Sequence, residues 1–243
     1  MTERTSPIAA PLIVAIDGPA GAGKSTVARA LAQRFGLLNL ESGAMYRAFA
    51  LKALNSSVAT GDAAALEALA HATQVRLEPR VESGSDVNRV LLDNADVTDQ
   101  LRTPQITAAA SQVSVHPPIR RWLVGLQQAL GAQGNVVMEG RDIGTVVFPH
   151  APVKIFLDAS PEKRGERRYE QTKENAAVTQ VPAKVLEEIR ERDRRDRTRA
   201  DSPLRPAPDA TIIDSTDLTL DQVIERAAAL VESYLGTAGS GSV

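Results

Sequence analysis

The chain has 243 residues, of which 43% are hydrophobic and 24% charged, values ordinary for a soluble globular protein. Its net charge of −2 argues against a general nucleic-acid binder, and the absence of cysteine excludes disulfides, thiolate metal sites and cysteine nucleophiles. No apolar run approaches the roughly 20 residues of a membrane span, and residues 1–11 lack the apolar core of a signal peptide. We therefore expect a cytoplasmic protein with a flexible N-terminus (1–11) and a loose tail (236–243).

The first informative stretch is Gly18-Pro19-Ala20-Gly21-Ala22-Gly23-Lys24-Ser25-Thr26, which matches the phosphate-binding pattern G-x-x-x-x-G-K-[ST]. A buried strand is expected before it, over residues 12–16, and a helix after it, with Val27, Leu31 and Phe35 on one face and Gly36 at its end. A chance glycine-rich turn is the alternative, which this strand–loop–helix context disfavours. The pattern predicts that backbone amides hold phosphates, that Lys24 contacts the β- and γ-phosphates and that Ser25 ligates magnesium.

The next segments continue an alternation of strand and helix. Residues 37–40 form a short apolar run, typical of a second strand, and a helix is expected from Ser42 to about Leu54. Ser42 is a candidate cap, with Tyr46 and Arg47 near the start of that helix. Taken alone, this stretch fits a capped helix with an exposed arginine better than it fits a site.

Residues 63–105 interrupt this alternation. An alanine-rich helix over 63–72 is followed by two short strands, 74–78 and 87–92, and by a turn at 94–96. Because no helix separates these strands, we expect an insertion with a small antiparallel sheet. Helices at 107–115 and 118–130 follow, and the single tryptophan, Trp122, is assigned to packing.

The last part of the chain restores the alternation. Strands are expected at 135–138, 153–157 and 210–213, and helices from Pro161, over 182–199 and from a capping box at Thr219 to about Leu235. Five apolar strands alternating with helices predict a parallel, doubly wound sheet. Charged residues 139–142 follow the third strand, where ligands bind in open α/β sheets.

Missing motifs disfavour two classes of P-loop protein, the regulatory GTPases and the transport ATPases. The guanine reader Asn-Lys-x-Asp, the Asp-x-x-Gly switch and the transporter signature Leu-Ser-Gly-Gly-Gln do not occur. Arginines instead surround the expected crevice, at Arg47, Arg141, Arg164, Arg167, Arg168 and Arg192. Because arginine binds phosphate bidentately, this surplus favours a second phosphorylated substrate.

The charged stretch 190–199 has two interpretations. Alternating arginine and acidic residues usually form a solvated helix with ion pairs four residues apart. However, Arg192, Asp196 and Arg199 fall on one helical face, where they could together hold a phosphate and a ribose hydroxyl. The three histidines, His71, His116 and His150, are scattered and are assigned to structural or surface positions.

Several stretches together resemble bacterial cytidylate (CMP/dCMP) kinases, collinearly over residues 12–235. They are residues 18–26, 41–47, 110–113, 139–149, 153–158 and 191–199, and the stretch Gly-Arg-Asp-Ile-Gly-Thr-Val-Val is the most specific. The resemblance implies an α/β P-loop fold of three layers, with a five-stranded parallel sheet, a lid helix pair at about 160–180 and a nucleoside-monophosphate-binding region at about 42–130. The insert at about 63–105, with its small antiparallel sheet, belongs to that region.

The resemblance also implies roles for individual residues. The acceptor nucleotide, CMP or dCMP, would contact Ser42, Tyr46, Arg47, Ser111, Arg120, Arg141, Asp142, Arg192, Asp196 and Arg199. ATP would contact residues 18–26 and Arg164 of the lid, with Lys24, Arg141 and Arg192 as catalytic residues. Two departures from the family pattern are Glu139, where the family often has aspartate, and Arg195, which shifts the register before Asp196.

The expected reaction is phosphoryl transfer from ATP to CMP or dCMP, with Mg²⁺ as the cofactor and a monomeric enzyme. No general base is expected, because a phosphate acceptor is already largely ionised at neutral pH. Cytosine would donate its amine to Asp142 and accept from Arg120, and uracil would mispair at Asp142. The rival hypotheses are another small P-loop kinase, for adenylate or an alcohol, and a non-catalytic P-loop switch.

Overall fold

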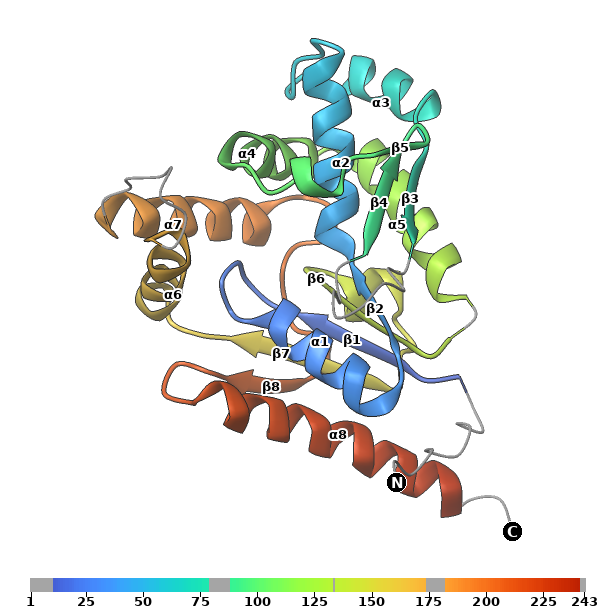
Figure 1. Cartoon of the computed structure of the whole chain (residues 1–243), viewed down its shortest axis with the longest axis vertical. Coiled ribbons are helices and arrows are strands. Elements are labelled where there is room, and N and C mark those ends of the chain that lie inside the picture. Colours follow the sequence, from blue (N-terminus) through green and yellow to red (C-terminus); the bar gives the residue numbers. More distant parts are fainter. Residues whose placement is uncertain (1–10, 79–87, 133, 174–181, 241–243) are drawn as a thin grey trace.

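The computed structural model describes residues 11–78, 88–132, 134–173 and 182–240 (Figure 1). Its strands are β1 (Ile13–Asp17), β2 (Leu38–Glu41), β3 (Val75–Glu78), β4 (Arg89–Leu92), β5 (Ala95–Asp96), β6 (Val136–Gly140), β7 (Val153–Asp158) and β8 (Thr211–Asp214). Its helices are α1 (Lys24–Phe35), α2 (Ser42–Asn55), α3 (Ala63–His71), α4 (Pro104–Val113), α5 (Pro117–Gly131), α6 (Pro161–Lys173), α7 (Pro182–Thr198) and α8 (Leu220–Ser240). Two short turns complete the list, a 3-10 turn η1 (Thr98–Gln100) and a π turn η2 (Ile143–Val147).

The main sheet has five parallel strands in the order β2-β6-β1-β7-β8, which confirms the predicted doubly wound sheet. Successive side chains of β1 serve two cores. Val14 and Ile16 pack with α1 and α8 on one face, whereas Ala15 packs with α2 and α5 on the other. This burial on both faces explains why the central strands read as continuous apolar runs.

The predicted insertion is confirmed as a second, antiparallel sheet, β3-β4-β5, at the end of the molecule opposite α8 (Figure 1). Val75 and Leu77 of β3 are buried, and the alternate residue Arg76 is exposed, as the period of two requires. The predicted turn at 94–96 lies one residue too late. Asp93 and Asn94 have positive φ and form the turn, and Ala95 and Asp96 belong to β5, which sequence analysis missed.

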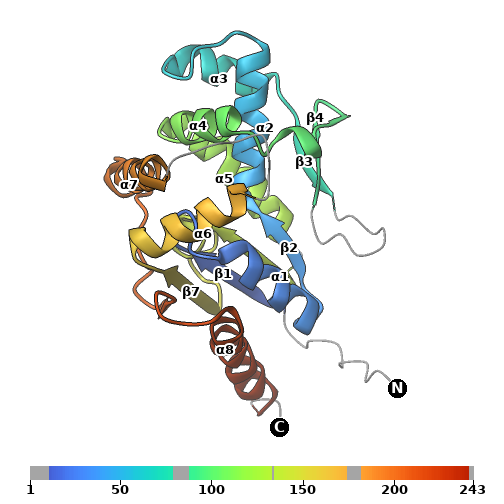
Figure 2. The ribbon, with the colours of Figure 1, turned by 60° about the vertical axis from the view of Figure 1, so that its left-hand side comes forward.

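α6 and α7 lie side by side and stand next to the carboxyl ends of β1 and β7 (Figures 1 and 2). The lid was predicted at about 160–180, and its residues 174–181 lie outside the described residues. α7 continues without a break through Arg195 and Asp196. The two helices therefore form a pair that reaches over the edge of the main sheet.

Two local predictions are corrected by the structure, and one element was not predicted. Ser42 is the first residue of α2 and not its cap, because the cap position is Glu41 and no side chain caps the helix. α8 extends to Ser240, so residues 236–240 of the expected tail are helical; residues 1–10 and 241–243 lie outside the described residues. The π turn η2, which follows Asp142, was not predicted.

Several predicted details are confirmed. Gly36 ends α1 in the left-handed conformation, and the Thr219 hydroxyl and the Gln222 amide form the reciprocal capping box of α8. Trp122 packs edge-on against Phe49, with ring centroids 5.2 Å apart. Within the described ranges, no helix is long and apolar enough to cross a membrane.

Candidate active site

The glycine loop between β1 and α1 has the geometry of a phosphate cradle. Gly23 precedes α1 in the left-handed conformation, with φ of 96°, and no side chain caps the first turn of the helix. A Cβ at Gly18 would lie 1.9 Å from the carbonyl oxygen of Leu157, so only glycine fits where β1 passes β7. Because no side chain caps α1, the backbone amides of its first turn can bind an anion.

Lys24 and Ser25 begin α1 and are already oriented. The buried Lys24 Nζ donates to the carbonyl oxygen of Pro19, 2.7 Å away, which holds the ammonium group over the loop. Burial, with Arg141 nearby, lowers the pKa of Lys24 to about 7. The Ser25 hydroxyl donates to Glu139 Oε1 at 2.5 Å. Phosphate groups would therefore add the negative charge that this loop lacks.

The carboxyl end of β6 supplies the centre of the site. Arg141 Nε donates to Asp196 Oδ2 of α7 at 2.8 Å, and Asp142 forms an ion pair with Arg120 of α5. Arg120 is only 2% exposed and Asp142 only 5%, so this pair is buried. Arg199, just after α7, is 3.8 Å from the same carboxylate.

One cavity, of about 2130 Å³, joins the glycine loop to these residues. Every residue that the resemblance assigned to the acceptor lines it: Ser42, Tyr46 and Arg47 of α2, Ser111 of α4, Arg120, Arg141, Asp142, and Arg192, Asp196 and Arg199 from α7 and its end. Residues 20–26 of the predicted ATP site line the same cavity, whereas Gly18 and Pro19 do not. Segments more than 150 positions apart in the sequence are thus brought around one space.

The cationic side chains of the cavity favour binding of an anionic ligand. Burial, followed by the neighbouring Arg141, lowers the pKa of Arg192 to about 10. Burial raises the pKa of Asp196, but Arg141 and Arg192 outweigh it and hold that pKa below its usual value. Burial lowers the pKa of Arg141 as well, but the carboxylates of Asp196 and Glu139 outweigh it and raise that pKa above its usual value. Asp196 is therefore shared by two guanidinium groups, of which Arg192 is the less compensated.

Unpaired polar atoms point to the same conclusion. Among the described residues that line the cavity, eight buried atoms have no hydrogen-bond partner: Arg29 Nε, Tyr46 Oη, Arg47 Nε, Ser111 Oγ, Arg120 Nε, Arg192 Nε, Arg195 Nε and Arg199 Nη2. A buried donor without an acceptor costs about 1–3 kcal/mol, so such a set is unusual unless a ligand completes it. Six of the eight atoms belong to residues that the resemblance assigns to the acceptor, and the other two belong to Arg29 and Arg195.

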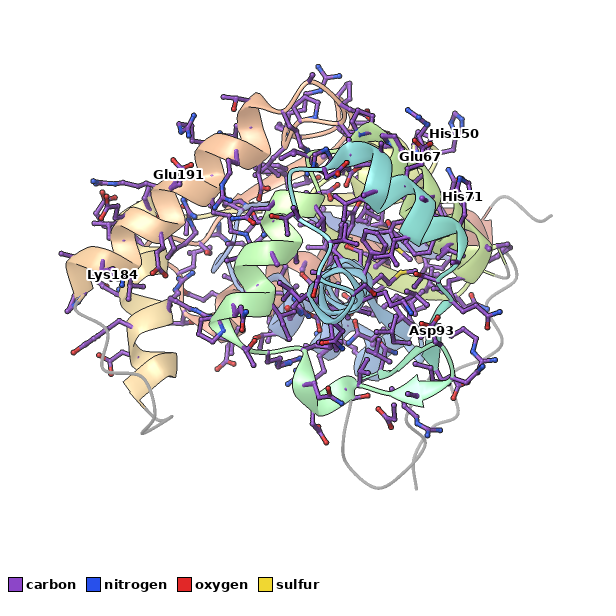
Figure 3. All side chains as sticks on the ribbon, turned by 90° about the horizontal axis from the view of Figure 1, so that it is seen from above. Glu67, His71, Asp93, His150, Lys184 and Glu191 are labelled. Atoms are coloured by element: carbon purple, nitrogen blue, oxygen red, sulfur yellow. The ribbon has the colours of Figure 1, made fainter. Side chains whose placement is uncertain are left out.

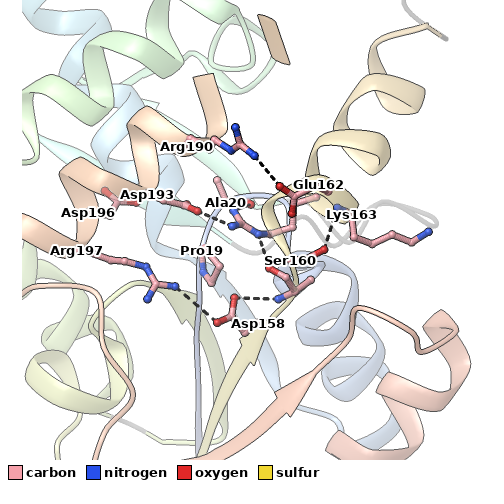
Figure 4. A network of polar contacts seen from close by, with 12 residues as sticks. Pro19, Ala20, Asp158, Ser160, Glu162, Lys163, Arg190, Asp193, Asp196 and Arg197 are labelled. Atoms are coloured by element: carbon pink, nitrogen blue, oxygen red, sulfur yellow. Dashed lines mark hydrogen bonds and ion pairs between the residues drawn. The ribbon is translucent and has the colours of Figure 1, made fainter. Parts of the chain in front are cut away.

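Arg164 lies elsewhere. It is 1% exposed and sits behind the glycine loop, where it donates to the carbonyl oxygens of Ala159 (2.9 Å) and Ala20 (3.0 Å) and to Asp193 Oδ2 (2.5 Å). Figure 4 shows this network at the base of α6, with Arg190–Glu162 and Arg197–Asp158 beside it. The cavity is lined instead by Arg167 and Arg168, one turn further along α6.

The histidines take no part in the site. His71 and His150 are exposed and lie at the edge of the molecule opposite α7 (Figure 3). His116 Nε2 contacts the carbonyl oxygen of Thr60 at 2.8 Å and precedes α5. Their assignment to structural and surface positions is confirmed.

Sequence reasoning assigned no role to three residues in or near the cavity, Glu41, Arg102 and Asp17. Glu41, at the end of β2, pairs with Arg47 and with Arg102, 3.3 Å away, and all three line the cavity. Asp17, at the end of β1, is 3% exposed and accepts two backbone amides of η2. The signal that could have identified Glu41 and Asp17 is a carboxylate directly after an apolar strand.

The residues of the loop fit a magnesium ion. Among the described residues, no group of three or more His, Cys, Asp or Glu could hold a metal ion by itself. Magnesium bound with a nucleotide commonly uses only one or two protein oxygens, together with phosphates and water. The hydroxyl of Ser25, with the Glu139 carboxylate beside it, provides this type of oxygen donor.

Comparisons with known proteins agree with this geometry. A family model described as "Cytidylate kinase" matches residues 14–233. A cytidylate kinase of Solibacter usitatus is 48% identical over 224 residues, covering 91% of this chain and 93% of that protein. A cytidylate kinase of Pelotomaculum thermopropionicum is 48% identical over 220 residues, covering 90% and 96%.

Among solved structures, a gluconokinase from Sinorhizobium meliloti is similar in fold, with a TM-score of 0.50 and 16% identity. The match covers 96% of this chain and 98% of that one. At this identity the likeness concerns the fold alone, and it agrees with the parallel sheet described above.

Proposed function

The chain belongs to the cytidylate kinase family, and from this premise we propose how its cavity performs the transfer of a phosphoryl group from ATP to CMP or dCMP. The product nucleotides are CDP and dCDP, and the reaction belongs to pyrimidine nucleotide metabolism. The observation that carries the proposal is the single cavity in which the glycine loop faces the ten acceptor residues.

ATP binds on the side of the glycine loop. Backbone amides of residues 20–26, which line the cavity, surround the β- and γ-phosphates. Lys24 neutralises the charge that develops on these phosphates during transfer. Arg167 and Arg168 of α6 line the same side and would reach the donor when the helix pair closes. Arg164 acts from behind, through the carbonyl oxygen of Ala20.

Magnesium would be held by Ser25, whose hydroxyl is oriented by Glu139. When bound, the ion would neutralise negative charge on the phosphates of ATP. The longer side chain of Glu139, where the family often has aspartate, fits this orienting role.

The cytosine ring is read by Asp142, Arg120 and Ser111. The carboxylate of Asp142 accepts from the exocyclic amine, and Arg120 and Ser111, each with an unpaired buried atom, donate to the ring edge. Uracil would turn a carbonyl oxygen toward the Asp142 carboxylate. Each mispaired buried group costs about 1–3 kcal/mol, so selectivity arises partly from repulsion.

The sugar and phosphate of the acceptor bind near α7. Arg47, Arg141 and Arg192 provide guanidinium groups for the phosphate, and Asp196 and Arg199 lie where the ribose hydroxyls would be. Arg141 also bridges to Asp196, which links the phosphate and ribose contacts. Tyr46 and Ser42 complete the wall on α2.

Transfer itself requires alignment and not a general base. The attacking group is a phosphate oxygen whose second pKa is about 6, so it is already largely ionised at neutral pH. Lys24, Arg141 and Arg192 surround the space between the two substrates and stabilise the charge on the transferred group. α6 and α7 exclude water that would otherwise accept the phosphoryl group.

A coupled assay tests the proposal. ATP is supplied with CMP, dCMP, UMP, AMP or shikimate, and kcat/KM is compared. We expect the highest values for CMP and dCMP. Faster turnover of AMP or UMP would contradict the assignment of the base-reading residues, and binding of ATP without turnover of any acceptor would favour a switch.

We further propose that the enzyme works as a monomer in the cytoplasm and without nucleic acid. The absence of cysteine agrees with a reducing compartment. Light scattering after gel filtration tests the oligomeric state, with a mass near 25.9 kDa expected.

A further inference from the structure

Arg141 and Asp142 are the only residues between two fixed points of the backbone. Gly140, the last residue of β6, pairs with Asp17, the last residue of β1. The next fixed point follows at once, since the amides of Ile143 and Gly144 donate to Asp17 Oδ1 and Oδ2, each at 2.7 Å. The carboxylate of Asp17 therefore closes a short loop across the β1–β6 pair.

The backbone around this loop is held on both sides. Before it, the Ser42 hydroxyl donates to the carbonyl oxygen of Glu139 at 2.7 Å. After it, the amides of Val146 and Val147 donate to the carbonyl oxygen of Asp142, at 2.9 and 3.2 Å. The loop is thereby restrained at both ends, which limits how far the carboxylate of Asp142 can move.

The contact with Asp17 is also tightly packed. A Cβ at Gly144 would lie 3.2 Å from Lys154 Cδ, tighter than most Cβ contacts, and 3.4 Å from Asp17 Oδ2, at the limit of ordinary van der Waals contact. Asp17 is 3% exposed, and burial, its largest influence, raises the pKa of this carboxyl to about 6. A buried carboxylate is costly, and two charge-assisted bonds to amides partly offset that cost.

Asp17 is not positioned to contact a substrate. It does not line the cavity, whereas its neighbour in space, Asp142, does. Asp17 also directly precedes Gly18, the first residue of the phosphate-binding loop. One strand end thus leads into the donor site and holds the loop of the base-reading carboxylate.

We propose that Asp17 is the positioning residue for acceptor selection: its two bonds to the amides of Ile143 and Gly144 fix Asp142 where the acceptor base is read. This inference rests on the proposed function. It adds that discrimination between cytosine and uracil depends on a carboxylate that touches neither substrate.

The test is the isosteric substitution Asp17→Asn. Its amide group can accept from one backbone N–H, and its NH₂ opposes the other. We expect the ratio of kcat/KM for CMP to that for UMP to fall by about tenfold, mainly through KM for CMP, as a small displacement of a binding group would cause. KM for ATP should stay within about twofold of the wild-type value.

A matched control removes a different contact to η2. Gln128 is exposed and its Nε2 donates to the carbonyl oxygen of Val147 at 3.2 Å, at the far end of the turn. Gln128→Ala should lower Tm slightly and leave the CMP-to-UMP ratio unchanged. A substitution that affects only stability lowers Tm but does not change the CMP-to-UMP ratio of kcat/KM.

The outcomes separate the inference from the proposed function. A wild-type enzyme that does not prefer CMP removes the proposed function. A wild-type enzyme that prefers CMP, with a folded Asp17→Asn variant of the same ratio, overturns the inference alone. Should Asp17→Asn fail to fold, Asp17→Glu, which keeps the carboxylate and lengthens the side chain by one methylene, must lower the ratio, and an unchanged ratio there overturns the inference equally.

Discussion

At the scale of single residues, the site depends on a buried ion pair. Asp142 and Arg120 are both nearly inaccessible and compensate each other's charge. Removing one partner of a buried pair leaves the other uncompensated, which commonly costs about 3–5 kcal/mol. The residues that we propose read the base therefore also join α5 to the end of β6.

The variant Asp142→Ala tests this double role. We expect CMP to lose its advantage over UMP, while the affinity for ATP, measured by titration, remains close to wild type. The free energy of unfolding should fall, because Arg120 is left buried and unpaired. If ATP binding were lost and CMP binding retained, the assignment of the two sides of the cavity would be reversed.

Asp17 gives the protein a distinctive dependence of stability on pH. Its pKa is about 6 in the folded protein and 3.8 in a model peptide. Between these values only the folded state holds the proton, so raising the pH from about 4 to about 6 lowers the free energy of unfolding. The contribution of this one group is about 3 kcal/mol.

Urea denaturation of wild type and Asp17→Asn at several pH values measures this contribution. Other titrating groups cancel in the difference between the two proteins. We expect that difference to change across pH 4–6 in the direction that favours wild type at low pH. A difference that is flat over this range would show that Asp17 ionises with an ordinary pKa.

Residue roles were predictable where they depend on neighbours in the sequence. The glycine loop, Lys24 and Ser25 form one continuous stretch, and their geometry follows from the strand and helix around them. Asp17 was not recognised because its partners are 126 and 127 positions away. The pairing of Ser25 with Glu139 spans 114 positions and was missed for the same reason.

At the scale of elements, α7 presents two charged faces to two different neighbours. Arg190, Asp193 and Arg197 face the base of α6 and the end of β7 (Figure 4). Arg192, Asp196 and Arg199 line the cavity. Asp193, Asp196 and Arg199 are buried, so the solvated-helix interpretation is wrong for them, whereas it holds for the exposed Arg190, Arg194 and Arg197. Glu191 forms the expected ion pair four residues along the helix with Arg195, at 3.6 Å.

Arg164 connects the glycine loop to α7, because it donates both to the carbonyl oxygen of Ala20 and to Asp193. Substitution of Arg164 therefore tests how α7 supports the loop. Arg164→Met should destabilise the protein by about 3–5 kcal/mol, because Asp193 keeps its charge without a partner. It should also raise KM for ATP, since the carbonyl oxygen of Ala20 loses its donor.

A second substitution separates the two effects. In Arg164→Met/Asp193→Leu no buried charge remains, so urea denaturation should show most of the stability restored. KM for ATP should stay raised, because the contact with Ala20 is still missing. Recovery of both properties together would mean that Arg164 matters for folding only.

Element boundaries followed from periodicity wherever a long apolar pattern existed. The two-residue strand β5 and the five-residue turn η2 are too short to show a period, and both depend on contacts made elsewhere in the fold. The extension of α8 to Ser240 contradicts the usual behaviour of a Gly- and Ser-containing end. Nothing in the described contacts explains that extension.

At the scale of the whole molecule, acceptor binding should be visible from the single tryptophan. Trp122 lies two residues after Arg120 on α5, and its partner Phe49 lies three residues after Tyr46 on α2. Groups assigned to the acceptor thus sit within one turn of both rings. Titration with CMP should change the emission of Trp122, whereas ATP alone should have a much smaller effect.

The variant Phe49→Leu serves as the control for this signal. It removes the edge-on aromatic contact and keeps an apolar side chain, so the response to CMP should shrink while turnover is retained. A strong response to ATP with none to CMP would place the acceptor away from α2 and α5.

The sheet order has a consequence for how this architecture tolerates change. β1 leads into the glycine loop, the proposed donor site, and β6 leads into Arg141 and Asp142, which we propose bind the acceptor. The two strands are hydrogen-bonded neighbours. Their separation is set by backbone pairing at about 4.8 Å, whatever the side chains are. The small sheet and α3 can therefore lengthen, shorten or diverge among descendants without altering the span that the phosphoryl group must cross.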